Sequence, residues 1–194
     1  MLQKFEFIKT DFDGAYIINP FVSTDSRGAF IKDYSKEIFE ANGINHNLAE
    51  VFYAENQAGV IRGMHFQRVF QQVKLVRCVK GKIYDVIVDL RPDSPTFLKW
   101  QGFYLTEDNY QQIYVPENFA HGYLALEPST VVYKCNEGFK SEYDDGIKFD
   151  DPDFNITWPI NEIKAEGFDS LEKLIRSEKD QNLQSFAEYK RKYL

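Results

Sequence analysis

Short apolar runs separated by polar turns follow one another from about residue 73 to residue 135, and this pattern restricts the chain to a β-rich fold. Short strands at regular spacing are typical of a sandwich or a barrel. The first two runs meet around Lys80 and Gly81, which predicts a hairpin between them. The runs predicted as strands are residues 73–79, 83–90, 97–105, 111–115, 122–126 and 130–135.

The N-terminal part of the chain predicts a few shorter elements. Residues 15–22 read as a strand that Pro20 stops, and residues 29–33 form a second short strand after a turn. Ser35 is a candidate cap for a short helix that ends at Gly43.

The C-terminal part changes in character beyond Trp158 and Pro159. Residues 168–176 predict a helix, and residues 186–194 predict another short one. These pieces could cover a barrel end or an edge strand. Because the chain has 194 residues, we expect one domain, residues 1–194.

Charge and composition narrow the choice of partner and compartment. The formal net charge of −7 argues against nucleic acid as the main partner. No apolar run approaches the roughly 20 residues that span a bilayer, so we expect no membrane segment. Cys78 and Cys135 both lie in predicted strands, which indicates two buried thiols in a reducing compartment. We therefore expect a cytoplasmic protein.

One stretch of the chain, residues 59–67, combines Arg62, His65 and Gln67 within a predicted β-rich run. Such a cluster can bind an anion and move a proton in one place. Regular strand alternation would put His65 and Gln67 on the same face as Ile61, with Arg62 on the opposite face. A bulge near Gly63 would instead bring Arg62 and His65 to one pocket.

Three side chains have both a structural and a chemical interpretation. His65 is either a satisfied core histidine or a proton acceptor at neutral pH. Lys74 shares an apolar strand face, where a lysine needs a route to solvent, a counter-charge or a function. Tyr133 is either a core tyrosine with one hydrogen bond or a proton donor to a strong base.

The remaining histidines suggest an oriented imidazole rather than a metal site. Asp85 and Asp89 share a face of one predicted strand, and either could orient His121. Metal sites of small β-barrels need neighbouring histidines with a carboxylate or a third histidine. His65 has no second histidine nearby and His46 lies in a predicted turn, so we expect no metal.

Several motifs, taken together and in order, resemble the dTDP-4-dehydrorhamnose 3,5-epimerase family of the cupin superfamily. The resemblance runs from about residue 8 to the C-terminus. The motifs are DSRG at 25–28, VIRGMHFQ at 60–67, KLVR at 74–77, DVIVDLR at 85–91, SPTF at 94–97, VPENFAHG at 115–122 and GIKFDDP at 146–152.

The resemblance implies a cupin jelly-roll barrel with short flanking and C-terminal helices, a homodimer, and a site without metal or cofactor. It implies proton removal beside the ketone of a nucleotide-linked 4-keto-6-deoxy sugar, an enolate, and reprotonation from the opposite face. By resemblance, His65 is the base, Tyr133 the acid and Lys74 the group that stabilises the enolate oxygen. Asp180, in the motif SEKD at 177–180, would orient His65.

The resemblance also implies a substrate-binding set, in which Arg62 binds the diphosphate. The other positions are Arg27, Lys32, Glu50, Phe52, Gln67, His121, Phe139 and Lys179. Better-known members have Gln-x-Asn at residues 50–52 and often Glu at position 32, and this chain carries extra residues at about 164–174. These departures leave the nucleotide and the sugar open.

Other functions are compatible with parts of this pattern. An epimerase of a single centre would use the same residues. A 3,4-ketoisomerase is disfavoured because Phe66 and Gln67 stand where those enzymes have a second histidine. A non-catalytic module that binds sugar nucleotides would keep Arg62 and Arg27 but could lose His65 or Tyr133. A metal-dependent cupin oxygenase would contain stoichiometric iron.

Overall fold

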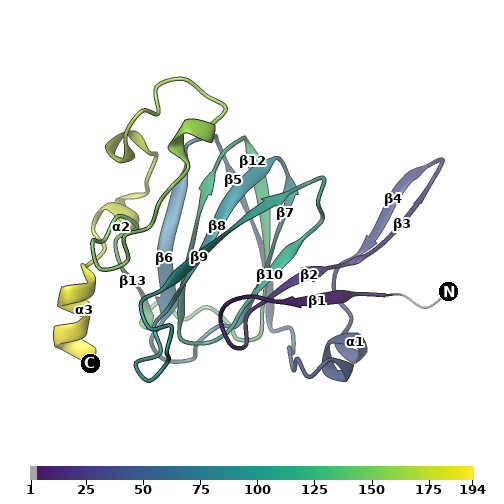
Figure 1. The fold of residues 1–194 in the computed structure, drawn as a ribbon, viewed down its shortest axis with the longest axis horizontal. Coiled ribbons are helices and arrows are strands. Elements are labelled where there is room, and N and C mark those ends of the chain that lie inside the picture. The colour runs from purple at the N-terminus through teal and green to yellow at the C-terminus, as the bar shows by residue number, and fades with distance from the viewer. Residues whose placement is uncertain (1–3) are drawn as a thin grey trace.

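The computed structural model describes residues 4–194, and its main body is a pair of antiparallel sheets that pack face to face (Figure 1). The first sheet has the order β1 (Glu6–Lys9), β2 (Tyr16–Asn19), β10 (Gln112–Val115), β7 (Lys74–Lys80), β12 (Ser129–Cys135) and β5 (Glu50–Asn56). The second has the order β13 (Asp144–Gly146), β6 (Ile61–Gln67), β11 (Phe119–Ala125), β8 (Lys82–Asp89) and β9 (Trp100–Thr106). The prediction of a mainly β jelly-roll fold is confirmed.

The main core lies between the two sheets. Val76 and Cys78 of β7 and Val131 of β12 face Ile83 and Ile87 of β8, and all are fully buried. Alternation along each strand puts every second side chain into this layer. Cys78 and Cys135 are both free and buried, as the sequence predicted.

A second apolar layer covers the outer face of the five-stranded sheet. The C-terminal segment supplies it with η1 (Ile160–Glu162), η2 (Leu171–Lys173), α2 (Glu178–Gln181) and α3 (Phe186–Tyr193). Ile160 of η1, Leu171 of η2 and Phe186 of α3 belong to the same apolar cluster as the outward-facing Met64 and Val86. Figure 1 shows this yellow-green segment beside β6 and β13, so it covers a sheet face rather than a barrel end.

The outer face of the six-stranded sheet has its own cover, the helix α1 (Lys36–Ala41). Its Phe39 is fully buried against Ile18 and Leu75. The predicted helix is confirmed, but the Ser35 side chain makes no capping hydrogen bond. Burial of Phe39 therefore stabilises this short helix more than its cap does.

Two predicted elements are wrong. β7 and β8 do not pair, because the chain crosses from one sheet to the other between them. Gly81 makes the crossing with a φ of 73°, and a Cβ there would lie 2.2 Å from the Pro128 carbonyl oxygen. Residues 168–176 form only the single turn η2, because Ile175 pairs in parallel with Val60 and extends the chain.

A separate hairpin consists of β3 (Phe21–Asp25) and β4 (Gly28–Lys32). It projects from the sheets on the side away from α3 (Figure 1). Phe30 on this hairpin is 60% exposed, which is unusual for so large an apolar side chain. In residues 4–194, no helix is both long and apolar enough to cross a membrane.

Candidate active site

A cavity of about 510 Å³ opens between the two sheets. Its size is typical of a small-molecule site. It contains every predicted site residue except Arg27 and Lys32, namely Glu50, Phe52, Arg62, His65, Gln67, Lys74, His121, Tyr133, Phe139, Lys179 and Asp180. Gln72, Asp144 and Ser177 also line it, and the sequence had given them no role.

An irregularity in β6 brings Arg62 and His65 into the same cavity. His121 of β11 pairs with His65 and Tyr123 pairs with Arg62, so β6 has one residue more than β11 between these pairs. Gly63 has a φ of 129°, and a Cβ there would lie 2.6 Å from the Gly122 Cα. The bulge hypothesis is therefore supported. The expectation that Ile61 shares a face with His65 is wrong, since Ile61 packs in the outer layer.

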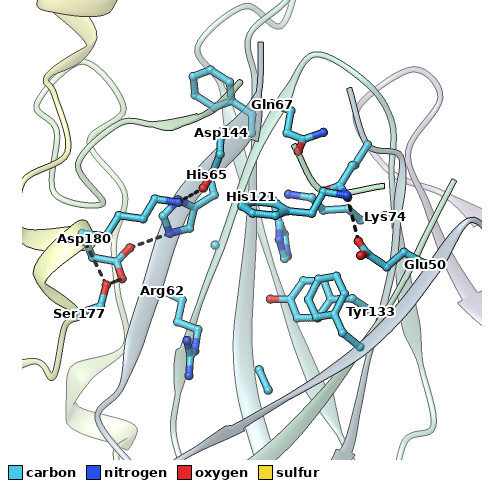
Figure 2. Close-up of a pocket in the computed structure, with 17 residues that line it drawn as sticks. Glu50, Arg62, His65, Gln67, Lys74, His121, Tyr133, Asp144, Ser177 and Asp180 are labelled. Atoms are coloured by element: carbon cyan, nitrogen blue, oxygen red, sulfur yellow. Dashed lines mark hydrogen bonds and ion pairs between the residues drawn. The ribbon is translucent and has the colours of Figure 1, made fainter. Parts of the chain in front are cut away.

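His65 and Asp180 form a hydrogen-bonded pair on one wall of the cavity (Figure 2). Nε2 of His65 lies 2.7 Å from Oδ1 of Asp180. Asp180 also accepts hydrogen bonds from the Ser177 hydroxyl at 2.5 Å and the Gly63 amide at 3.2 Å. Burial alone would raise the pKa of Asp180, but these three donors outweigh it and lower the pKa to about 2.

The anionic state of Asp180 determines how His65 is arranged. A carboxylate that accepts the Nε2 proton leaves the lone pair of the imidazole at Nδ1. Nδ1 of His65 is buried and has no hydrogen-bond partner within residues 4–194. Asp180 therefore fixes the His65 imidazole, and its negative charge would stabilise an imidazolium at this position.

Tyr133 lies on the opposite side of the cavity from His65 (Figure 2). Its ring stacks on Phe52 with centroids 4.7 Å apart and meets His121 edge-on at 5.8 Å. Only 8% of Tyr133 is exposed, and burial raises its pKa well above 10. The phenol is therefore protonated at neutral pH and can donate its proton only to a strong base.

Lys74 and His121 lie between these two walls. Burial lowers the pKa of Lys74, although Cys135, Asp144 and Asp85 oppose this effect. An ammonium withdrawn from water interacts strongly with any negative charge that develops beside it. Lys74 can therefore stabilise an anionic intermediate.

His121 forms a second histidine–aspartate pair, and its partner is Asp85 rather than Asp89. Nε2 of His121 lies 2.8 Å from Oδ2 of Asp85, and both side chains are almost completely buried. Burial raises the pKa of Asp85, although His121 partly opposes it. Asp89 instead accepts hydrogen bonds from Arg91, Ser94 and Thr96, so it orders a loop outside the cavity.

The rim of the cavity depends on Gln67. Its amide nitrogen donates to the Phe70 and Gly138 carbonyls at 2.6 and 3.4 Å, and its amide oxygen accepts from the Lys140 amide at 2.6 Å. These bonds use the amide to join two loops. The Phe139 backbone amide donates to the Glu50 carboxylate at 3.2 Å. Glu50 and Gln67 therefore hold the loop that carries the Phe139 ring at the opening of the cavity.

A second ion pair crosses the rim near Asp180. Lys179 of α2 pairs with Asp144 of β13 (Figure 2). The sequence signal for Asp144 is weak, because β13 has only three residues and was not predicted. Ser177 could have been found, since it precedes Asp180 by three residues and caps α2.

Arg27 and Lys32 lie outside the cavity, on the β3–β4 hairpin. The Arg27 side chain is 87% exposed and pairs with Asp25 at 2.6 Å. No residue of the same hairpin lines the cavity. A single copy of the chain therefore does not bring Arg27 to His65.

The donor set of the cavity favours an organic anion. Arg62, Lys74 and Lys179 supply positive charge, and Phe52 and Phe139 supply aromatic faces. Within residues 4–194, no group of three or more His, Cys, Asp or Glu side chains is arranged to hold a metal ion. The cavity can thus bind a charged aromatic ligand and exchange protons on two sides.

Comparison with known proteins agrees with this geometry. Residues 9–188 match the family model described as dTDP-4-dehydrorhamnose 3,5-epimerase. A relative from Methanothermobacter thermautotrophicus, named dTDP-4-dehydrorhamnose 3,5-epimerase, is 44% identical over 93% of this chain and 94% of its own.

Solved structures extend the likeness to the fold. The enzyme of that name from Bacillus anthracis, with TDP and PPi bound, is 38% identical with a TM-score of 0.84, over 94% of this chain and 99% of its own. A dTDP-6-deoxy-D-glucose-3,5-epimerase from Legionella pneumophila, in complex with dTDP-4-keto-L-rhamnose, is 32% identical with a TM-score of 0.86, over 95% and 94%.

Proposed function

This chain belongs to the dTDP-4-dehydrorhamnose 3,5-epimerase family, and we propose that it epimerises a dTDP-linked 4-keto-6-deoxy sugar with His65 as base and Tyr133 as acid. One observation carries the assignment of roles. A carboxylate-paired imidazole and a protonated phenol face one cavity from opposite sides (Figure 2). Inversion of a carbon centre requires this arrangement, because the proton leaves one face and returns to the other.

The chemistry begins with the ketone at carbon 4, which acidifies the hydrogens on carbons 3 and 5. His65 removes one of these protons, and Asp180 stabilises the imidazolium. The electron pair moves to the ketone oxygen and forms an enolate, whose charge Lys74 stabilises. Tyr133 then gives its hydroxyl proton to the opposite face of the carbon.

The nucleotide end of the substrate has matching groups. The Arg62 guanidinium is held by Asn56 at 2.9 Å and has further N–H groups for diphosphate oxygens. Phe139 at the rim offers a ring on which a nucleobase can stack. The two solved structures described above contain dTDP-4-keto-L-rhamnose or TDP, which supports a dTDP-linked substrate here.

We propose a homodimer in which the β3–β4 hairpin contacts the second copy. The hairpin exposes Phe30, and the edge strand β5 exposes Val51 and Tyr53. An unpaired edge with large apolar side chains is a surface that a partner commonly covers. A dimer of this kind would explain why Arg27 lies far from the cavity of its own chain.

Deuterium exchange tests the reaction directly. The protein is incubated with dTDP-4-keto-6-deoxyglucose in deuterated water, and the sugar is followed by NMR. We expect deuterium at carbons 3 and 5, with the His65→Gln variant as the control that shows none. Exchange at one carbon would restrict the enzyme to that centre. No exchange with this or any other 4-keto sugar nucleotide would contradict the proposal.

A further inference from the structure

Two buried residues behind the cavity wall, Asn56 and Tyr123, connect Arg62 with Tyr133. Neither of the two lines the cavity. The Tyr123 hydroxyl donates to Oδ1 of Asn56 at 3.0 Å. Nε of Arg62 donates to the same oxygen at 2.9 Å. The amide oxygen of Asn56 therefore accepts one hydrogen bond from the buried Tyr123 phenol and one from Arg62, the residue proposed to bind the diphosphate.

Tyr123 is also the neighbour of Tyr133. Their ring centroids are 6.5 Å apart. The neighbouring Tyr123 also contributes to the raised pKa of the buried Tyr133 phenol. Tyr123 therefore lies between Tyr133, which its ring neighbours, and Asn56, which its hydroxyl contacts.

Asn56 is itself fixed by hydrogen bonds to the backbone. Its amide nitrogen donates to the Ala54 carbonyl at 3.1 Å and to the Ser129 carbonyl at 3.4 Å. These bonds leave the amide oxygen pointing at Arg62 and Tyr123. The position of the Tyr123 hydroxyl is therefore set by two strands, β5 and β12.

We propose that Tyr123 is a positioning residue for proton transfer by Tyr133, and that Asn56 couples it to Arg62. This inference rests on the function proposed above. When the O–H bond of Tyr133 breaks and its proton forms a C–H bond with the enolate, a buried phenolate remains.

The hydroxyl of Tyr123 then turns from Asn56 to the phenolate oxygen of Tyr133. A buried phenolate needs a donor, and the neighbouring Tyr123 carries a hydroxyl hydrogen. Oδ1 of Asn56 keeps its bond from Arg62, so the rotation leaves no buried acceptor unpaired. Two donors on one acceptor thus allow the hydroxyl to move at little cost.

The decisive variant is Tyr123→Phe, which removes one oxygen atom. We expect kcat for epimerisation to fall about 10- to 100-fold, the range for a lost hydrogen bond to a charged group. KM should change less than about twofold, because Tyr123 does not line the cavity. A double-mutant cycle is completed by the single-turnover rates of Tyr133→Phe and of the double variant that combines Tyr123→Phe with Tyr133→Phe. The double variant should be no slower than Tyr133→Phe alone, because Tyr123 acts through Tyr133.

A second variant and a matched control separate this role from a loss of packing. Asn56→Asp keeps an oxygen in place but holds the Tyr123 proton more strongly, so kcat should fall here too. Tyr114→Phe removes another buried hydroxyl outside the cavity and should leave kcat unchanged. Thermal unfolding checks that all variants fold.

Each result bears on one of the two proposals. An unchanged kcat for Tyr123→Phe, or independent additive losses in the double variant, would overturn the positioning role while wild-type epimerisation still stands. Absence of epimerisation by the wild-type protein would overturn the proposed function and this inference with it.

Discussion

The cavity contains two histidine–aspartate pairs of opposite electrostatic character. Asp180 beside His65 accepts hydrogen bonds from three donors, and its pKa falls to about 2. Asp85 beside His121 is completely buried, and its pKa is raised. Oδ1 of Asp85 has no hydrogen-bond partner within the described residues 4–194.

The difference shows how hydrogen-bond donors act against burial on the pKa of a carboxyl. Burial acts against ionisation in both pairs and is the largest influence on each pKa. Ser177 and the Gly63 amide tip the balance at Asp180. We infer that the ionised Asp180 suits His65 to the role of base, while His121 with Asp85 is suited to hold an oxygen of the substrate.

We expect the largest effect from substitutions that remove one of the two imidazoles and leave the other in place. His65→Ala should abolish turnover, a loss of at least about 10³-fold, because no other group takes the proton. His121→Ala should lose less, since it removes a binding contact. Turnover is measured by NMR and dTDP binding by calorimetry, and we expect binding to persist in His65→Ala. If that variant retained a few per cent of the rate, His65 would not be the base.

We expect the next largest effect when the carboxyl of Asp180 or of Asp85 is replaced by an amide. Asp180→Asn removes a negative charge and should lower kcat about 10²- to 10⁴-fold. Asp85→Asn replaces a carboxyl whose pKa burial raises, so it should cost less than about tenfold. The kcat values of the two variants, compared at pH 7, provide the measurement. Equal losses would contradict the difference between the two pairs.

At acidic pH, Asp180 and Asp85 should affect the free energy of unfolding in opposite directions as the pH changes. The folded pKa of Asp180 lies below its unfolded value, so its contribution is present above about pH 4 and is lost as pH falls toward about 2. It amounts to about 2 kcal/mol. Asp85 has a raised folded pKa, so its contribution is largest at low pH and falls as pH rises from its unfolded value, near 3.9, through the folded one.

Urea unfolding between pH 2.5 and 6 measures both contributions. Asp180→Asn should reduce the loss of stability toward low pH, whereas Asp85→Asn should reduce the loss toward higher pH. The wild-type protein is the reference at each pH. A shift of the same sign in both variants would contradict the comparison.

The smallest expected effect concerns Ser177, which makes Asp180 unlike Asp85. Ser177→Ala removes a donor to Asp180 and the cap of α2, which should lower kcat several-fold and cost about 1 kcal/mol of stability. Ser185→Ala is the matched control, because Ser185 caps α3 without contact to Asp180. It should cost similar stability and leave kcat unchanged. An equal loss of kcat in both would assign the effect to helix stability.

Most of the fold followed from local pattern, and the errors have physical causes. The strands between residues 74 and 135 were found because alternation reports which side chains are buried. The false hairpin at Lys80 and Gly81 arose because a turn motif does not tell whether two strands pair or belong to opposite sheets. The false helix at 168–176 arose because pairing with Val60 overrode local helical preference.

The candidate site was predicted unevenly. Residues that share a short motif, such as Arg62 and His65, could be grouped by sequence, although their common face needed a bulge. Asn56 and Tyr123 carried no signal, because a buried asparagine and tyrosine in strands are ordinary core residues until their partners are known. Asp144 was missed because its strand, β13, has only three residues and was not predicted.

The sequence by itself determined the β-rich class, the family resemblance and the residue types available for proton transfer. Tertiary structure alone decided the direction in which the pKa of each carboxyl shifts, which wall carries each proton carrier, and that one copy leaves Arg27 outside the cavity. The physical reason is that strand patterns are local, with a period of two residues. The pKa of Asp180 depends on donors that include the Gly63 amide, 117 residues away along the chain.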